Sequence, residues 1–165
     1  MNKPSDNLLA ESLIRTLGAV KGKAGTYGAG HTVETAFFKS LGLDTSAIDL
    51  VDGSGLSRFD LITPHVVAAL LRAMHEKADW QAYYDSLPIA GVDGSLRNRM
   101  KGTPAANNVH AKTGSLGGVS SLSGYVKSMG GDLYVFTVIM NNFPGSDADA
   151  HAAQDKFAVT LATLP

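Results

Sequence analysis

The part of the sequence from residue 109 to residue 141 constrains the fold most. Three segments in it have the composition and alternation of strands: residues 109–113, 120–127 and 133–141. Short connections that contain glycine join them, and such connections favour antiparallel neighbours. These segments therefore predict a three-stranded antiparallel meander. Both alternating sets of side chains in 133–141 are largely apolar, so we expect this strand to be covered on both faces.

Helical patterns precede and follow the meander. Predicted helices cover residues 7–17, 32–41, 80–84, 96–100 and 148–164, and a further helix begins at Thr63-Pro64. In the first of them Leu9, Leu13 and Leu17 recur every four residues. In the last, Ala153, Phe157 and Leu161 are expected to pack on the sheet. Residues 20–30 are rich in glycine and predict a loop. Helices, then a meander, then one helix make an α+β arrangement.

Composition excludes several classes of function. Hydrophobic residues make up 44% of the 165 residues and the formal net charge is −1, so we expect a folded domain that does not bind nucleic acid. The chain has no cysteine, which excludes disulfides, thiolate metal sites and cysteine nucleophiles. The five histidines lack metal-ligand spacing, and we expect no metal and no cofactor.

One motif that could carry chemistry is Lys112-Thr113-Gly114, at the end of the first predicted strand. An ammonium beside a serine lowers the cost of deprotonating that serine and binds a carboxylate. Thr113 can bind the same carboxylate, and Gly114 lets a substrate backbone approach the strand. The N–H of Ser115 could point toward an oxyanion. The alternative is a lysine near a strand end, and the tripeptide alone does not decide between the two.

The second motif, Ser5-Asp6-Asn7, lies just before the first predicted helix. Taken alone it is best interpreted as a helix N-cap. The functional interpretation is that the Ser5 hydroxyl passes a proton between a nucleophile and a leaving nitrogen, while the Asn7 amide holds the substrate amide. Ser-Asp-Asn followed by Lys-Thr-Gly gives two of the three motifs of penicillin-binding proteins and class A β-lactamases. Both occur here in the right order and context.

Longer stretches make the resemblance specific. The chain resembles the class C penicillin-binding proteins, which are D-Ala-D-Ala carboxypeptidases and endopeptidases, in residues 5–11, 52–58, 86–99, 110–116 and 122–125. This resemblance implies a penicilloyl-serine transferase fold of the β-lactamase/DD-peptidase kind. It also implies a periplasmic location, peptidoglycan D-Ala-D-Ala peptides as substrates and β-lactams as inhibitors, with no cofactor.

The resemblance also implies roles for individual residues. Catalysis would depend on Ser5 as the proton relay, on Asn7 and on Lys112. Substrate would be bound by Thr113, Gly114 and Ser115, the last through its backbone N–H. The arginines Arg97 and Arg99 are more simply interpreted as solvated side chains, and Phe37, Phe38 and Trp80 as core residues.

One family motif is missing from the sequence. The family nucleophile is a serine in Ser-x-x-Lys, and no serine among the 165 residues has lysine three positions later. We therefore expect residues 1–165 to be the C-terminal part of a single penicillin-binding domain whose N-terminal portion carries the nucleophile and serves as a partner. The isolated chain should then be inactive. The alternative is a non-catalytic remnant or half-domain that acts as a binding module.

Overall fold

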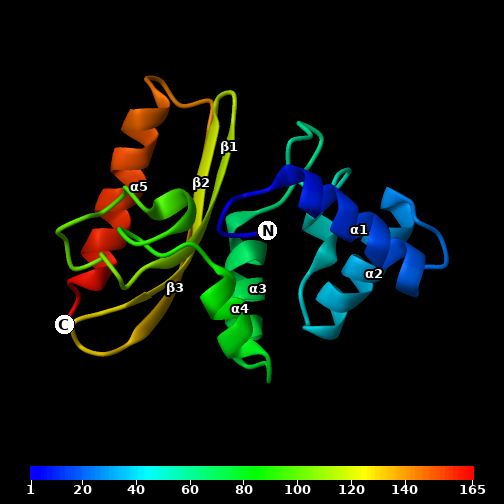
Figure 1. Ribbon diagram of the computed structural model, residues 1–165, viewed down its shortest axis with the longest axis horizontal. Coiled ribbons are helices and arrows are strands. Elements are labelled where there is room, and N and C mark those ends of the chain that lie inside the picture. Colours follow the sequence, from blue (N-terminus) through cyan, green and yellow to red (C-terminus); the bar gives the residue numbers. More distant parts are fainter. The chain divides into compact units, whose positions relative to one another are not determined.

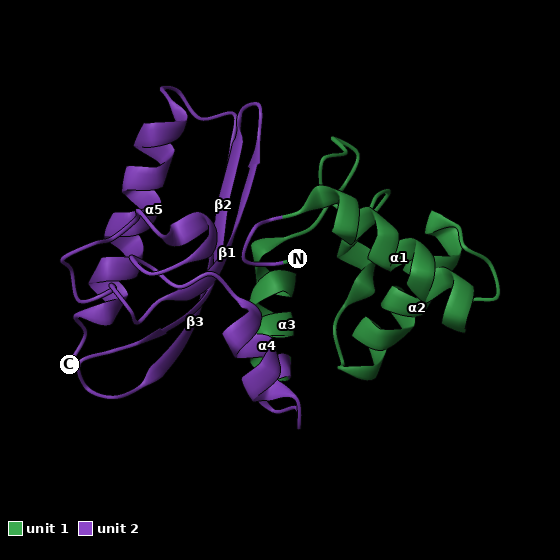
Figure 2. Cartoon of the chain, viewed as in Figure 1, with its two compact units in different colours: residues 1, 6–73 green, residues 2–5, 74–165 purple.

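The computed structural model describes all 165 residues and divides them into two compact units (Figure 2). Unit 1 contains Met1 and residues 6–73. Unit 2 contains residues 2–5 and 74–165, so the short segment Asn2–Ser5 belongs with the C-terminal part of the chain. None of its helices combines the length and the apolar character that a membrane span requires.

Unit 1 is helical. It contains α1 (Asn7–Lys21), α2 (Tyr27–Ser40), a 3₁₀ turn at Thr45–Ala47 and most of α3 (Pro64–His75), as Figure 1 shows. The predicted loop at 20–30 is shorter than expected, because helices occupy both of its ends. As predicted, α3 begins at Pro64, and the Thr63 hydroxyl accepts a hydrogen bond from the N–H of Val66 at 3.3 Å.

The leucine repeat of α1 does not form its buried face. Leu9 and Leu13 are about half exposed, whereas Ile14 and Gly18 are buried. The reason is a close crossing of α1 and α2. A Cβ atom added at Gly18 would lie 2.8 Å from the backbone nitrogen of Gly30, so only glycines allow the two backbones to approach this closely. Backbone contact thus takes the place of a leucine interface.

Unit 2 is built on the predicted meander. Its strands β1 (His110–Leu116), β2 (Val119–Lys127) and β3 (Leu133–Asn141) are antiparallel in the order β1-β2-β3. The first strand is longer than predicted, because Leu116 pairs with Val119 around a two-residue turn of glycines. In the register Lys112 lies opposite Ser123, which in turn lies opposite Thr137.

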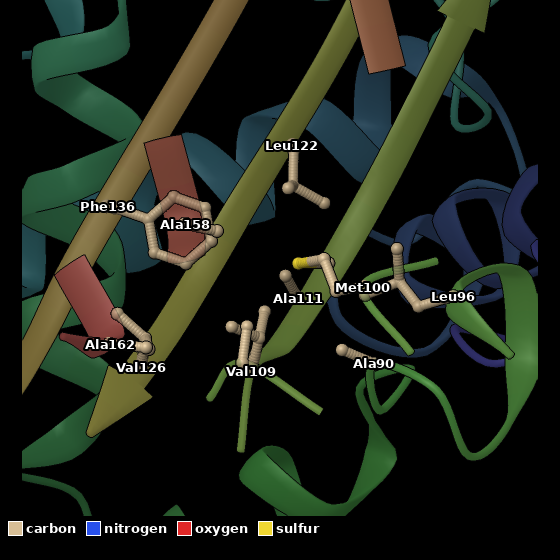
Figure 3. Packing of buried hydrophobic residues seen from close by; sticks show 11 residues of the cluster. Ala90, Leu96, Met100, Val109, Ala111, Leu122, Val126, Phe136, Ala158 and Ala162 are labelled. Atoms are coloured by element: carbon tan, nitrogen blue, oxygen red, sulfur yellow. The ribbon is translucent and has the colours of Figure 1, made fainter. Parts of the chain in front are cut away.

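One face of this sheet packs against α5 (Asp147–Ala162), which begins at a capping box formed by Ser146 and Asp149. Figure 3 shows Leu122, Val126 and Phe136 of the sheet directed toward the same buried cluster as Ala158 and Ala162 of the helix. Of the predicted packing residues, Leu161 packs against this cluster, and the half-exposed Phe157 ring lies 6.2 Å from the Phe136 ring of β3. Ala153 is exposed instead. The buried stripe of α5 consists of three alanines, which let the helix lie close to the sheet, and one glutamine: Ala150, Gln154, Ala158 and Ala162.

The opposite face of the sheet carries an aromatic cluster around buried Tyr125. The ring of Trp80, in α4 (Trp80–Ser86), meets the Tyr125 ring edge-on at 4.7 Å. Trp80 is therefore a packing residue, as predicted. The core prediction also holds for Phe38, which is buried, but is wrong for Phe37, which is 43% exposed. The expected cover of β3 is only partial, since Phe136 is its one fully buried residue.

The predicted helix at 96–100 is wrong. A single 3₁₀ turn, Gly94–Leu96, occupies its start, and turns follow it as far as Asn108. The Asp93 carboxylate does not cap this turn, because it accepts a hydrogen bond from the N–H of Ile89 instead. Met100 adopts a left-handed backbone conformation with φ of 57°. Both features oppose a regular helix.

Candidate active site

Lys112 lies at the centre of a polar group in unit 2. Its ammonium donates hydrogen bonds to the hydroxyl oxygen of Ser5 at 2.7 Å and to the carbonyl oxygen of Thr113 at 2.6 Å. The contact with Ser5 joins residues 107 positions apart in the sequence. Burial lowers the pKa of Lys112 below its ordinary value, because desolvation disfavours the charged amine.

The Ser5-Asp6-Asn7 motif is shared between the two units. Asp6, rather than Ser5, is the N-cap of α1, and its carboxylate accepts a hydrogen bond from the N–H of Leu9 at 2.9 Å. The Ser5 hydroxyl is therefore available to Lys112. Ser5 is exposed and has a left-handed backbone with φ of 55°, which is uncommon for a residue with a side chain. Asn7 is the first residue of α1 and belongs to unit 1.

The residues after Lys112 lie along the edge strand of the sheet. Because Ala111 donates its N–H to Pro88 on the side away from β2, the alternation of a strand directs the N–H groups of Thr113 and Ser115 to the same outer side. Ser115 is exposed there. Gly114 faces Ser121 across the strands, and a Cβ atom at this position would lie 2.5 Å from the Ser121 hydroxyl oxygen. A side chain at this position would force the Ser121 hydroxyl to rotate away.

Aromatic packing supports the start of this strand. The His110 ring stacks on Tyr84 with a centroid separation of 3.9 Å and an interplanar angle of 11°, and its Nδ1 lies 3.3 Å from the Tyr84 carbonyl oxygen. Burial lowers the pKa of His110, although the hydrogen bond to the Tyr84 carbonyl opposes the shift. His110 therefore belongs to a packed region two residues before Lys112.

Sequence reasoning missed three residues that contact this group. The Thr113 hydroxyl donates to the hydroxyl of Ser95 at 2.7 Å, and the N–H of Ser95 donates to the Lys3 carbonyl oxygen at 3.1 Å. The Lys3 ammonium pairs with the Asp93 carboxylate. No local pattern marks these residues, apart from the position of Asp93 and Ser95 inside the resembling stretch 86–99.

The interpretation of Arg99 as a solvated side chain is wrong. Its guanidinium pairs with the Asp155 carboxylate at 2.7 Å and donates to the Gln154 side-chain oxygen at 3.0 Å. Both partners lie on α5, so Arg99 ties the turns of residues 97–108 to the C-terminal helix. Arg97 is exposed, as predicted.

With the fold and the geometry around Lys112 described, the sequence comparison gives the family. The model of the D-Ala-D-Ala carboxypeptidase 3 (S13) family matches residues 1–164, and the chain belongs to this family. The predicted resemblance and the predicted fold are thereby confirmed.

Individual relatives agree. The chain is 43% identical to a D-alanyl-D-alanine carboxypeptidase of Actinomadura sp. (strain R39), over 97% of this chain and 30% of that protein. It is also similar to the crystal structure of penicillin binding protein 4 (dacB) from Haemophilus influenzae. The TM-score is 0.91 at 29% identity, over 99% of this chain and 38% of that one. A second structure of that protein holds a β-lactam and gives a TM-score of 0.89 at 30% identity. The chain spans about a third of the length of the relatives it matches.

Proposed function

We propose that Ser5, Asn7 and Lys112 are catalytic residues of a serine-type D-Ala-D-Ala carboxypeptidase/endopeptidase that acts on peptidoglycan peptides through an acyl-serine intermediate. The observation that carries this proposal is the 2.7 Å hydrogen bond between the Lys112 ammonium and the Ser5 hydroxyl. It links the two family motifs present in the chain. Membership of the S13 family supports the substrate class.

The direction of this hydrogen bond suits a proton relay. An ammonium only donates, so the Ser5 oxygen accepts from Lys112 and its own hydroxyl proton is free to point elsewhere. In the proposed acylation step, the nucleophilic serine attacks the carbonyl carbon between the two D-alanines. The Ser5 oxygen takes the proton of that serine, and the Ser5 hydroxyl gives its own proton to the departing amine. The acyl-serine bond forms as the amide bond breaks.

The edge strand supplies the proposed binding groups. The Lys112 ammonium and the Thr113 hydroxyl would bind the terminal carboxylate of the peptide. The outward N–H of Ser115 would stabilise the oxyanion, and Gly114 would leave room for the peptide backbone. Asn7 would hold the substrate amide. Burial lowers the pKa of Lys112, so this amine gives up its proton more readily than the amine of an exposed lysine.

The domain assignment follows from the missing motif. We propose that residues 1–165 form the C-terminal part of a single penicillin-binding domain, and that a segment with Ser-x-x-Lys outside these residues provides the nucleophile and completes the domain. We also propose that the protein is periplasmic and that β-lactams inhibit it. The β-lactam bound to penicillin binding protein 4 of H. influenzae supports the second point.

Acylation by a labelled penicillin tests the role of Lys112. In the complete polypeptide that carries residues 1–165, Lys112→Ala should lower the second-order acylation rate constant about 100-fold or more, because it removes a charged donor from the site. The matched control is Lys127→Ala, since Lys127 is exposed at the end of β2. Near-normal acylation of the Lys112→Ala protein would refute the assigned role.

A second candidate is a non-catalytic half-domain that acts as a binding module. The absence of Ser-x-x-Lys from the 165 residues favours it. The sequence of the complete gene discriminates between the two candidates. A Ser-x-x-Lys motif encoded in the same polypeptide supports the enzyme, and a complete polypeptide without one supports the binding module.

A further inference from the structure

The segment Asn2–Ser5 is attached to the rest of unit 2 by contacts at each end. At its start, the Asn2 side-chain amide donates to the Ser86 hydroxyl at 2.9 Å. At its end, the Ser5 hydroxyl accepts from Lys112. Ser5 is exposed and its backbone is in the left-handed region, a conformation that is unfavourable for a residue with a side chain and persists only where neighbours hold it. The N–H of Ser5 donates to the Asn2 carbonyl oxygen at 3.3 Å, so the segment forms a turn of its own, and other groups hold this turn against the rest of unit 2.

The turn Asp93-Gly94-Ser95 supplies these groups. One Asp93 carboxylate oxygen pairs with the Lys3 ammonium, and the other accepts from the N–H of Ile89 at 2.9 Å. Burial alone would raise the pKa of Asp93, but the bonds from Lys3 and Ile89 outweigh it and lower the pKa. The carboxylate is thus ionised near neutral pH, and the Ile89 N–H holds it in place. Lys3 is consequently fixed two residues before Ser5.

The same turn contacts the backbone of the segment directly. The N–H of Ser95 donates to the Lys3 carbonyl oxygen at 3.1 Å. Gly94 has φ of 58°, and a Cβ atom added there would lie 2.7 Å from that same carbonyl oxygen. The backbone of the segment therefore lies in contact with Gly94, and any side chain at position 94 would displace the segment.

Ser95 also binds the opposite part of the site. Its hydroxyl lies 2.7 Å from the Thr113 hydroxyl, on the strand that carries Lys112, and accepts the Thr113 proton. When the Thr113 hydroxyl donates to a bound carboxylate, the Ser95 hydroxyl can donate to the Thr113 oxygen in turn and keep the contact. One exposed serine thus connects the backbone of the Ser5 segment with the edge strand. The two hydroxyls that the proposed mechanism uses, those of Ser5 and Thr113, are tied to one three-residue turn.

We propose that Asp93 and Ser95 are positioning residues, which hold the Ser5 hydroxyl and the Thr113 hydroxyl at a fixed separation so that both act on one bound peptide. This inference rests on the proposed function, because it gives the turn a task only if Ser5 relays a proton and Thr113 binds the carboxylate. The turn itself does not touch the reacting atoms. It acts through Lys3 and through Thr113.

A double-mutant cycle on Lys3 and Asp93 tests the proposal in the complete polypeptide. Asp93→Asn and Lys3→Met should each lower the rate constant of the acylation step between about tenfold and 100-fold, because misplacement of a catalytic group has effects of this size. The double variant should lose no more than either single variant. The dissociation constant of the noncovalent penicillin complex should change less than twofold. Additive losses, or a dissociation constant that rises as much as the rate falls, would overturn the proposal.

Asp155→Asn is the matched control. Asp155 also pairs with a basic side chain in unit 2, at a similar side-chain exposure of 26% against 35% for Asp93, but its partner Arg99 makes no contact with the Ser5 segment. This variant should lose stability and keep the wild-type acylation rate. A rate as low as that of Asp93→Asn would mean that any broken ion pair in unit 2 impairs the site, and would overturn the proposal.

Crystal structures of the wild-type and Asp93→Asn polypeptides provide a measurement that does not depend on activity. The contact between Lys112 Nζ and Ser5 Oγ should be lost or lengthened beyond hydrogen-bond distance in the variant. An unchanged contact would overturn the positioning role, whatever the acylation rates. Failure of the wild-type protein to react with penicillin would instead refute the proposed function, so the two failures are distinguishable.

Discussion

In unit 2 a continuous hydrophobic cluster fills the space between the sheet and α5, and eleven buried residues contribute to it. In unit 1 the buried hydrophobic residues are only Ile14, Phe38, Val66 and Leu71. Large apolar side chains of unit 1 are exposed instead, among them Leu8 at 76% and Phe59 at 77%. The polar group around Lys112 thus rests on the unit with the dense core. A rigid support of this kind is what a proton relay with fixed distances requires.

The same substitution made in both units tests this comparison with the largest expected effect. Leu122 of unit 2 is completely buried, so Leu122→Ala should lower the free energy of unfolding by about 2–5 kcal/mol. Leu13 of unit 1 is 54% exposed, and Leu13→Ala should cost less than about 1 kcal/mol, because little apolar surface is lost and alanine favours the helix. Urea unfolding followed by far-ultraviolet circular dichroism, which reports the helices of both units, measures both. Equal losses would contradict the described difference between the units.

A smaller effect is expected from the aromatic cluster on the other face of the unit 2 sheet. Burial holds the pKa of His110 below the ordinary value of about 6.5. As the pH falls below that value, the unfolded chain takes up a proton before the folded one does. The stabilisation is therefore complete above about pH 6.5 and is lost as the pH falls toward the lower folded pKa.

His110→Phe keeps a flat ring on Tyr84 and removes the titration. The difference in unfolding free energy between wild type and this variant should shift in favour of the variant as the pH falls from 7 to 5. The measurement is urea unfolding of both proteins at several pH values. A difference that stays constant over this range would show that His110 is not buried as described.

Regular structure could be predicted where short-range rules decide it. The three strands and the start of α3 at Thr63-Pro64 follow from alternation and from proline geometry. The faces of the helices could not be predicted, because they depend on which partner lies nearby. In α1 the crossing of Gly18 with Gly30 overrides the leucine repeat. In α5 alanines and Gln154 face the sheet, and Gln154 is held there by donating to the Ser120 hydroxyl at 2.9 Å.

In the candidate site, too, contacts between residues far apart in the sequence could not be predicted. Ser5 and Lys112 could be singled out in the sequence because each lies in a motif of a known family. The pairing of Lys3 with Asp93 could not be predicted, although Asp93 lies in a resembling stretch, because the two residues are 90 positions apart and neither local sequence indicates the other. A lysine followed two positions later by serine is common, and Asp-Gly-Ser is typical of any turn. Only the folded chain brings these residues together.

In the proposed site the nucleophile lies outside residues 1–165, so Ser5 is a proton relay and does not attack the substrate itself. Peptide mapping by mass spectrometry of the complete polypeptide after reaction with penicillin tests directly which serine attacks. We expect a single penicilloyl adduct on a serine of a Ser-x-x-Lys segment outside these residues, and none on Ser5. An adduct on Ser5, or on any other serine of residues 1–165, would contradict it.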